Sequence, residues 1–516
     1  LGDLEARIGL VAGFLSQKNH FGSLETRFEP APTLELWANG DGASLPAGEW
    51  METDWAALGF VDVDAPEPLK PYLSAVADIH ANLGEPPVPV GWCSWYHFYT
   101  DITEEVIASN LEAVQDLHSE VPLPLFQIDD GFETYPGDWF DFTQGFPDGL
   151  APLARKAHEA GLTPGVWLAP FIVHPKANLV EEHPEWLLRD ARGKPVTAGF
   201  VWNRFTHALD LTHPDALAYT KKVIRTAVEK WGFEYLKLDF LYAAALDGEY
   251  RDQTKTRAQV LRMGLEALRE AAGPDVTLLG CGCPLGSGLG IFEAMRISAD
   301  VSGYWEPHFP PISPVLRNEP HMPSARNALQ NILSRSLIHR RWWINDPDCL
   351  LVRPETELTL AEVQTLTSAI GLTGGSLLLS DDLPALSKTR LRLAQILLPV
   401  IDQRTRVIDW LDRYTPTMLR LDLEGPTGSW HLLAHFNWYK SIANLDFSPQ
   451  AFHLPEEHIW WVREFWTGEI GQMSADSPFT VYDVPPNGVS VLAVRPYDPE
   501  HPAYLGSNLH LSQGME

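Results

Sequence analysis

The sequence has few cysteines, few basic residues and no long apolar run. Four cysteines occur in 516 residues, with no CxxC pair, which argues against a disulfide framework and against a tetrahedral zinc site. Lysine and arginine total 38 against 68 acidic residues, so the net charge is −30. A surface this negative repels phosphate backbones and anionic lipid headgroups, so we expect neither a nucleic-acid nor a membrane partner. No segment reaches the ~18 uninterrupted apolar residues of a spanning helix.

Signals for targeting and secretion are also lacking. The sequence contains no Asn-x-Ser/Thr sequon and no basic-then-apolar leader, and reduced thiols suit a cytosolic protein. We therefore expect a cytoplasmic protein, although a chain that begins at Leu1 leaves open whether a leader precedes it. The remaining composition is ordinary for a globular protein, with 45% hydrophobic and 21% charged residues.

The length allows about three domains at roughly 100–200 residues each. Residues 1–86 combine strand-like runs, turns and a helical stretch, which indicates a partial, truncated N-terminal β-sandwich region with a linker helix. Residues 87–403 alternate short apolar runs with amphipathic helices. Residues 404–500 read as strands separated by Gly, Pro and Asp turns, which predicts an antiparallel β-sandwich. Residues 501–516 are polar, and we expect a loose tail there.

The central segment predicts an α/β fold of the (β/α)₈ TIM-barrel type. Amphipathic helices such as Thr103–His118 and His213–Trp231 separate most of its apolar runs. Eight runs are candidate strands: Val90–Trp95, Leu125–Asp130, Gly165–Phe171, Tyr235–Asp239, Thr277–Cys281, Met295–Asp300, Trp342–Asn345 and Ser376–Asp381. Eight strands with intervening helices over about 300 residues favour a barrel. A doubly wound sheet is the competing arrangement.

Polar residues stand where most of these strands end. The endings are Asp129-Asp130-Gly131, Asp239, Cys281-Gly282, Asp300, Asn345-Asp346 and Asp381-Asp382. Any one acidic residue after a strand is more often a helix cap or a turn residue. In a barrel, however, the carboxyl ends of all strands meet at one face, where the loops build the site. Six such endings therefore favour a shared acidic pocket.

Two carboxylates with neighbouring cations suggest a chemistry for that pocket. Strand alternation puts Lys237 beside Asp239, where the ammonium keeps the carboxylate ionised. Arg296 and Asp300 are four residues apart, which also puts them on one face of another expected strand. Glycoside hydrolysis uses such a pair, with one carboxylate attacking the anomeric carbon and the other protonating the departing oxygen. The residues alone leave open which carboxylate does which, and whether their separation is the ~5–5.5 Å of a retaining or the ~6.5–9.5 Å of an inverting enzyme.

Seven motifs in order, from about Pro89 to Asp382, resemble the α-galactosidases of glycoside hydrolase family 36, which belongs to the melibiase-like clan D. The motifs are Gly91-Trp92-Cys93-Ser94-Trp95-Tyr96, Gln127-Ile128-Asp129-Asp130-Gly131, Trp167-Leu168-Ala169-Pro170-Phe171, Lys237-Leu238-Asp239-Phe240, Gly280-Cys281-Gly282-Cys283-Pro284-Leu285, Arg296-Ile297-Ser298-Ala299-Asp300 and Asn345-Asp346-Pro347-Asp348-Cys349. Each motif is weak alone, but seven in order on successive strands are specific.

The resemblance implies a barrel between two β-sandwiches and exo-acting hydrolysis of terminal α-D-galactosides with retention of configuration. Asp239 then corresponds to the nucleophile and Asp300 to the acid/base. The resemblance also implies sugar-binding residues, which are Asp129 and Asp130 at the galactose hydroxyls including the axial O4, Trp167 as a wall, Lys237 near O3 and O4, Arg296 near O2, and Cys281 with Gly282 near O2. It implies no metal and no organic cofactor. The family's aromatic loop over the sugar has no identifiable counterpart in residues 1–86.

Several alternatives stay open at this point. Gly280 to Gly286 spells GxGxxxG, as in a dinucleotide loop, but Pro284 lacks the N–H that a phosphate needs there. Galactosyl transfer by the same covalent intermediate, as in raffinose-synthase-like relatives, and α-N-acetylgalactosaminidase activity are alternatives within the same chemistry. A catalytically dead barrel that only binds galactosides is an alternative of another class. The expected partner is a small α-galactoside or oligosaccharide, and a homo-oligomer is possible.

Overall fold

The computed structural model describes residues 1–3 and 5–515, and its centre is a parallel sheet. The strands of this sheet are β6 (Val90–Cys93), β7 (Leu125–Ile128), β8 (Thr163–Leu168), β12 (Tyr235–Leu238), β13 (Thr277–Gly280), β14 (Ala294–Arg296), β15 (Ile344–Asp346), β16 (Cys349–Leu350) and β17 (Leu377–Leu379). Each strand is short and buried throughout or nearly so, as is typical of parallel sheets with both faces covered.

The sheet closes into a ring. From β6 the pairing runs through β7, β8, β12, β13 and β14 to β15, and in the other direction from β6 through β17 to β16. Only Pro347 and Asp348 separate β15 from β16, so these two short strands together occupy one position. The result is a barrel of eight strand positions, which confirms the predicted (β/α)₈ class.

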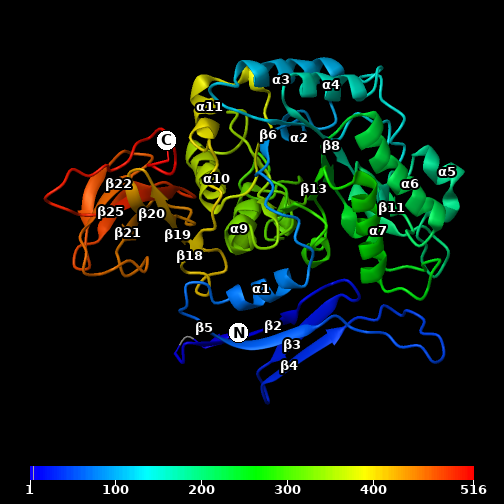
Figure 1. The fold of residues 1–516 in the computed structure, drawn as a ribbon, viewed down its shortest axis with the longest axis horizontal. Helices are drawn as coiled ribbons and strands as arrows, with labels where there is room; N and C mark the ends of the chain where they lie inside the picture. The colour runs from blue at the N-terminus through cyan, green and yellow to red at the C-terminus, as the bar shows by residue number, and fades with distance from the viewer. Residues whose placement is uncertain (4, 516) are drawn as a thin grey trace.

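Helices surround the barrel (Figure 1). They are α3 (Glu104–Asp116), α4 (Ala151–Glu159), α6 (Pro214–Arg225), α7 (Arg257–Ala272), α9 (Ala325–Arg335), α10 (Leu360–Thr373) and α11 (Lys388–Gln395), with the shorter α2 (Trp95–Phe98), α5 (Asn178–Glu182) and α8 (Ser313–Leu316) in loops. Local signals fix their ends. Helix α7 begins with a capping box of Thr256 and Gln259 and ends at Gly273, whose φ is +79°.

Antiparallel sheets flank the barrel on two sides (Figure 1). The N-terminal part consists of β1 (Gly2–Asp3), β2 (Ile8–Phe14), β3 (Gly22–Arg27), β4 (Thr33–Ala38) and β5 (Ala56–Asp62), followed by α1 (Lys70–Asp78). The C-terminal part consists of β18 (Arg406–Val407), β19 (Met418–Gly425), β20 (Gly428–Phe436), β21 (Ala443–Phe447), β22 (Trp460–Glu464), β23 (Ile470–Met473), β24 (Phe479–Val484) and β25 (Val489–Pro496). The predicted C-terminal antiparallel strands are thus confirmed.

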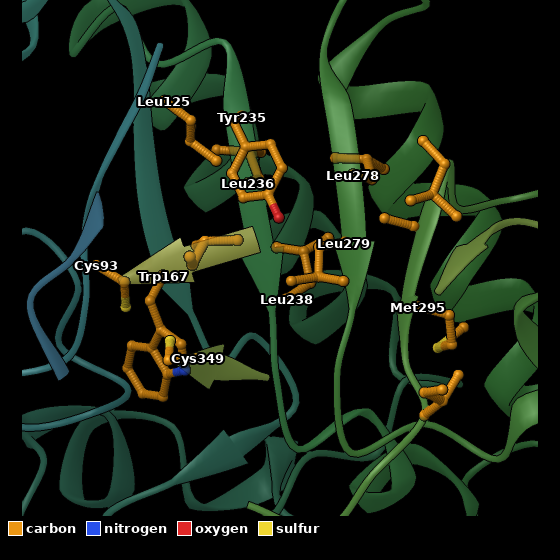
Figure 2. Close-up of a cluster of buried hydrophobic side chains, with 14 of the residues drawn as sticks. Cys93, Leu125, Trp167, Tyr235, Leu236, Leu238, Leu278, Leu279, Met295 and Cys349 are labelled. Atoms are coloured by element: carbon orange, nitrogen blue, oxygen red, sulfur yellow. The ribbon is translucent and has the colours of Figure 1, made fainter. Parts of the chain in front are cut away.

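Alternation along the barrel strands separates the core from the site. Figure 2 shows buried side chains of neighbouring strands, with Tyr235, Leu236 and Leu238 on β12. Lys237 lies between the two leucines in sequence, and its ammonium contacts a carboxylate from β7, so this side chain points into the ring. Leu236 and Leu238 point the other way, toward the helices. A short strand therefore contributes both to the core and to the barrel interior.

The structure corrects two sequence-based expectations about the ends of elements. Strand β14 ends at Arg296, so Asp300 lies in the following loop and does not share a strand face with Arg296. The expected loose tail is also partly wrong, because Leu511, Ser512 and Gln513 are fully buried. The backbone N–H of Leu511 donates to Ile396, which ties this segment to the barrel.

Candidate active site

The carboxyl ends of the barrel strands carry the predicted acidic residues. Asp129 and Asp130 directly follow β7, Asp239 directly follows β12, and Cys281 directly follows β13. The ladder continues briefly past these ends, since Asp239 N donates to Leu168 O and Cys281 N donates to Leu238 O, both at 2.8 Å. The barrel therefore fixes the backbone beneath each of these side chains and brings them to one face.

Asp129 forms a buried ion pair with Lys237. The Lys237 ammonium donates to Asp129 Oδ2 at 2.9 Å, and both side chains are at most 6% exposed. Gln127 Nε2 donates to the same oxygen at 2.7 Å, and the Cys93 thiol lies 3.4 Å from it. Burial disfavours the ammonium and is the largest single effect, but the Asp129 carboxylate together with the neighbouring Cys93 raises the pKa of Lys237 well above its usual range. Contrary to the sequence-based expectation, Lys237 thus pairs with Asp129 and not with Asp239.

Asp239 is held by two donors of its own. Trp167 Nε1 donates to Asp239 Oδ2 at 3.1 Å, and the backbone N–H of Phe240 donates to Oδ1 at 2.6 Å. Gly282 closes one side, because a Cβ at this residue would lie 3.0 Å from Oδ1. Its φ of +52° also favours glycine. The carboxylate is therefore fixed in orientation without a direct cation.

Asp300 lies at the open side of the site and is oriented by Arg296. Arg296 Nη1 donates to Asp300 Oδ1 at 3.0 Å, and the Asp300 side chain is 49% exposed. The buried guanidinium also pairs with Asp346 at 2.8 Å and with Asp348 at 2.9 Å. These two carboxylates outweigh the effect of burial and raise the pKa of Arg296. Arg296 is therefore a fixed cation.

The charges of the site act on one another. Desolvation raises the pKa of Asp300 above its usual range, while Arg296 opposes this rise and the Asp239 carboxylate adds to it. The buried thiol of Cys281 interacts with both carboxylates and with both cations, and burial raises its pKa well above the usual range, so the thiol is neutral. Asp239 and Asp300 thus lie within electrostatic range of each other, with Cys281 beside them.

Sequence reasoning missed Trp202. This residue is at the tip of the hairpin formed by β10 (Thr197–Val201) and β11 (Arg204–Ala208), which also pairs with β9 (Ile172–Val173). Its indole Nε1 donates to Asp130 Oδ2 at 2.6 Å, and its ring packs edge to face on Trp167 at 6.4 Å. Trp202 and Asn203 both have positive φ, as a two-residue hairpin turn requires.

Two further residues whose roles were not anticipated are Asp346 at the end of β15 and Asp348 in the connection to β16. Asp346 and Asp348 bind Arg296, and Asp348 also accepts hydrogen bonds from the Tyr96 hydroxyl and from Val301 N. Both residues lie in a motif quoted above, but the sequence did not indicate that Arg296 would be their partner. Through Val301 and Arg296, Asp348 supports the loop that carries Asp300.

Two features are absent from residues 1–3 and 5–515, the part of the chain that the structure describes. No group of three or more His, Cys, Asp or Glu side chains there is arranged to hold a metal ion. No helix in the same residues is long and apolar enough to cross a membrane.

Comparisons with known proteins match this chain to melibiases and α-galactosidases. The melibiase family model matches residues 72–269. An α-galactosidase of Escherichia coli is 28% identical over 218 residues, which are 40% of this chain and 29% of that protein. An "A type blood alpha-D-galactosamine galactosaminidase" of Flavonifractor plautii is 25% identical over 41% of this chain and 20% of that protein. The chain thus spans less than a third of the length of these curated relatives.

A solved structure covers more of the chain. The α-galactosidase TtGalA of Thermus thermophilus, in complex with p-nitrophenyl α-D-galactopyranoside, is 30% identical, with a TM-score of 0.62 over 80% of this chain and 77% of that one. The same enzyme with stachyose gives 31% identity and a TM-score of 0.61. A Lactobacillus brevis α-galactosidase, 13% identical, supports the fold alone, with a TM-score of 0.64 over 96% of this chain. On the similarity to TtGalA and the match to the family model, the chain belongs to the melibiase family of glycoside hydrolases.

Proposed function

We propose that this protein is an exo-acting, retaining α-galactosidase of the family 36 type. Asp239 is the nucleophile and Asp300 the acid/base. The observation that carries the proposal is the unlike surroundings of these two interacting carboxylates. Asp239 is oriented by two hydrogen-bond donors, whereas the pKa of Asp300 is raised by desolvation, which Arg296 opposes and to which the charge of Asp239 adds. Two acids with different environments suit two different roles.

The first step forms a glycosyl-enzyme ester. Asp239 attacks the anomeric carbon, the bond to the glycosidic oxygen breaks, and Asp300 gives its proton to that oxygen. The aglycone leaves as an alcohol. Trp167 and the Phe240 N–H hold the attacking carboxylate, so that its orientation needs no adjustment as the bond forms.

The second step releases the sugar. Asp300, now ionised, removes a proton from water, and the resulting oxygen nucleophile attacks the anomeric carbon and displaces Asp239. Two inversions return the α configuration. The guanidinium of Arg296 stabilises Asp300 when it is ionised and keeps it in place between the steps.

Recognition of galactose falls to the other residues of the site. Asp129 and Asp130 offer carboxylate oxygens to the sugar hydroxyls, with Lys237 beside Asp129 as a donor. The rings of Trp167 and Trp202 form an aromatic wall on which the C–H face of a pyranose packs. Trp167 lies on β8 and Trp202 lies between β10 and β11, so neither ring of this wall comes from the N-terminal sheets.

The decisive experiment uses p-nitrophenyl α-D-galactopyranoside. We expect hydrolysis, with proton NMR showing α-galactose as the first product before mutarotation. Asp239→Asn is the matched control, because it keeps the shape of the side chain and removes the nucleophile. β-Galactose as first product would refute retention. Binding of galactose without turnover in the wild-type protein would favour the non-catalytic barrel.

A second candidate is activity on 2-amino-substituted galactosides, which the name of the Flavonifractor plautii relative suggests. The buried Cys281 next to Gly282 favours a plain 2-hydroxyl, since an N-acetyl group needs more room there. Comparing kcat/KM for the p-nitrophenyl α-galactoside and its N-acetylgalactosaminide separates the two. Oligosaccharide formation at high galactoside concentration would reveal transfer.

We also propose a reducing, cytoplasmic location, which the four free cysteines suit.

A further inference from the structure

Glu133 is a buried acid that the mechanism above does not use. It lies in the loop after β7, three residues past Asp130, and is 4% exposed. Both of its carboxylate oxygens are buried, and neither has a hydrogen bond of good geometry within residues 1–3 and 5–515. The backbone N–H groups of Gly131 and Glu133 favour the ionised form, but the effect of burial on the pKa is larger than that of either, so an ionised carboxylate is unfavourable here.

The group in contact with Glu133 is the carboxyl of Asp130. The two lie within hydrogen-bonding reach, and each acts on the other. Burial, together with the charge of Asp130, raises the pKa of Glu133 well above its usual range. Two carboxyl oxygens can contact each other favourably only when a proton lies between them. Glu133 is then the donor and Asp130 the acceptor.

We propose that Glu133 is a positioning residue for sugar recognition, and that its neutral carboxyl donates a hydrogen bond to Asp130 and holds that carboxylate ionised and oriented toward the substrate. The proposal rests on the proposed function, because it assigns Asp130 to the sugar hydroxyls. It also explains how Asp130 stays charged although the nearest ammonium, Lys237, is engaged with Asp129.

The charges around Asp130 give the contact a pH dependence. Desolvation raises the pKa of Asp130 to about 6; the hydrogen bonds from Glu133 and Trp202 oppose the rise, Asp129 adds to it and Lys237 opposes it. Below that pH, Asp130 becomes neutral and accepts sugar hydroxyls less well, so binding weakens as the pH falls. His174 packs on Trp202 at 6.4 Å, and burial lowers its pKa, so it contributes no charge near neutral pH.

The test compares kcat/KM for p-nitrophenyl α-D-galactopyranoside between about pH 4 and 8 in the wild type, in two variants that lose a donor to Asp130 and in one matched variant that keeps it. In the wild type, kcat/KM at pH about 5 should be about tenfold below its plateau, one pH unit below the Asp130 pKa. Glu133→Gln keeps a neutral donor to Asp130, so the acid limb of its pH profile should coincide with that of the wild type. Glu133→Leu removes the donor, whose hydrogen bond lowers the pKa of Asp130, so its acid limb should move to higher pH and its loss at pH about 5 should exceed about tenfold. Trp202→Phe removes a donor to Asp130 and should move the limb to higher pH.

A second measurement avoids any failure of the Glu133 variants to fold. Infrared difference spectra at pH about 7, with and without galactose, should show a protonated carboxyl band that shifts when the sugar binds, both in the wild type and in Asp300→Ala, which lacks the proposed acid/base carboxyl. A distant buried acid would not respond to galactose. Absence of a responding band, or an unchanged acid limb in a folded Glu133→Leu protein, would overturn the proposal. Absence of any turnover in the wild type would instead refute the proposed function.

Discussion

Gly282→Ala tests whether the placement of Asp239 is what makes the site catalytic. The added Cβ would lie 3.0 Å from Asp239 Oδ1 and 3.0 Å from Phe240 N, the donor that holds that oxygen. Contacts this short require a shift of a few tenths of an ångström, and both partners are part of the nucleophile's hydrogen bond. The substitution therefore displaces the reacting carboxylate while leaving its chemistry intact.

Two separate effects are expected in this variant. Alanine at a φ of +52° costs about 1–2 kcal/mol of stability, the penalty for a left-handed backbone at a residue with a Cβ. A misplacement approaching 1 Å lowers the rate by up to about a hundredfold, so a smaller shift predicts a fall in kcat of roughly tenfold or more. KM should change less, because Asp129 and Asp130 do not touch Gly282.

Gly161→Ala is a matched control for the backbone effect. Gly161 also has a positive φ, +76°, and a Cβ there would have no atom within 4 Å. It should lose comparable stability in urea unfolding while keeping kcat within about twofold. The assay is initial-rate hydrolysis of the p-nitrophenyl galactoside by both variants. Equal kcat values for Gly282→Ala and the wild type would refute the assignment of Asp239 as an oriented nucleophile.

Three further predictions concern the acidic residues. Asp239→Asn should abolish turnover of every galactoside, checked with both aryl and natural substrates, because no ester intermediate can form. Asp300→Ala should keep activity on substrates with acidic phenol leaving groups and lose it on melibiose, since a good leaving group departs without a proton; equal losses on both would refute the acid/base role. Asp130→Ala should raise KM at an unchanged circular dichroism spectrum, and an unfolded variant would instead indicate a structural role.

The positions of the strands and of most acidic residues follow from local patterns. Asp129 and Asp239 each directly follow a short apolar run that forms a strand. Strand-end position is a property of a few consecutive residues, so the sequence is enough to place these carboxylates at the mouth of the barrel. The antiparallel C-terminal strands could be predicted equally well, because alternating apolar and polar residues and turn residues mark them in the sequence.

Side-chain pairing across the barrel could not be predicted in the same way. Alternation put Lys237 beside Asp239, but Asp239 lies past the end of β12, and the chain turns there, with Phe240 at a φ of +51°. Strand β8 separates β12 from β7, so the Lys237 ammonium reaches Asp129 across the barrel interior. Which strands lie within reach of a long side chain depends on closure of the ring, and no local pattern contains that information.

The hairpin turn holds Trp202 in a backbone conformation that is unfavourable for a tryptophan, and in this conformation Trp202 contacts Asp130 in the candidate site. A two-residue turn with positive φ at both positions favours Asn and Gly, and tryptophan there costs about 1–2 kcal/mol. Glycine at residue 202 would relieve the strain but would remove the donor to Asp130 and the ring beside Trp167. Backbone strain of this kind persists where the contact it provides has a use. The turn therefore supports, from the backbone and independently of the acidic residues, the proposal that Trp202 forms part of the sugar-binding wall.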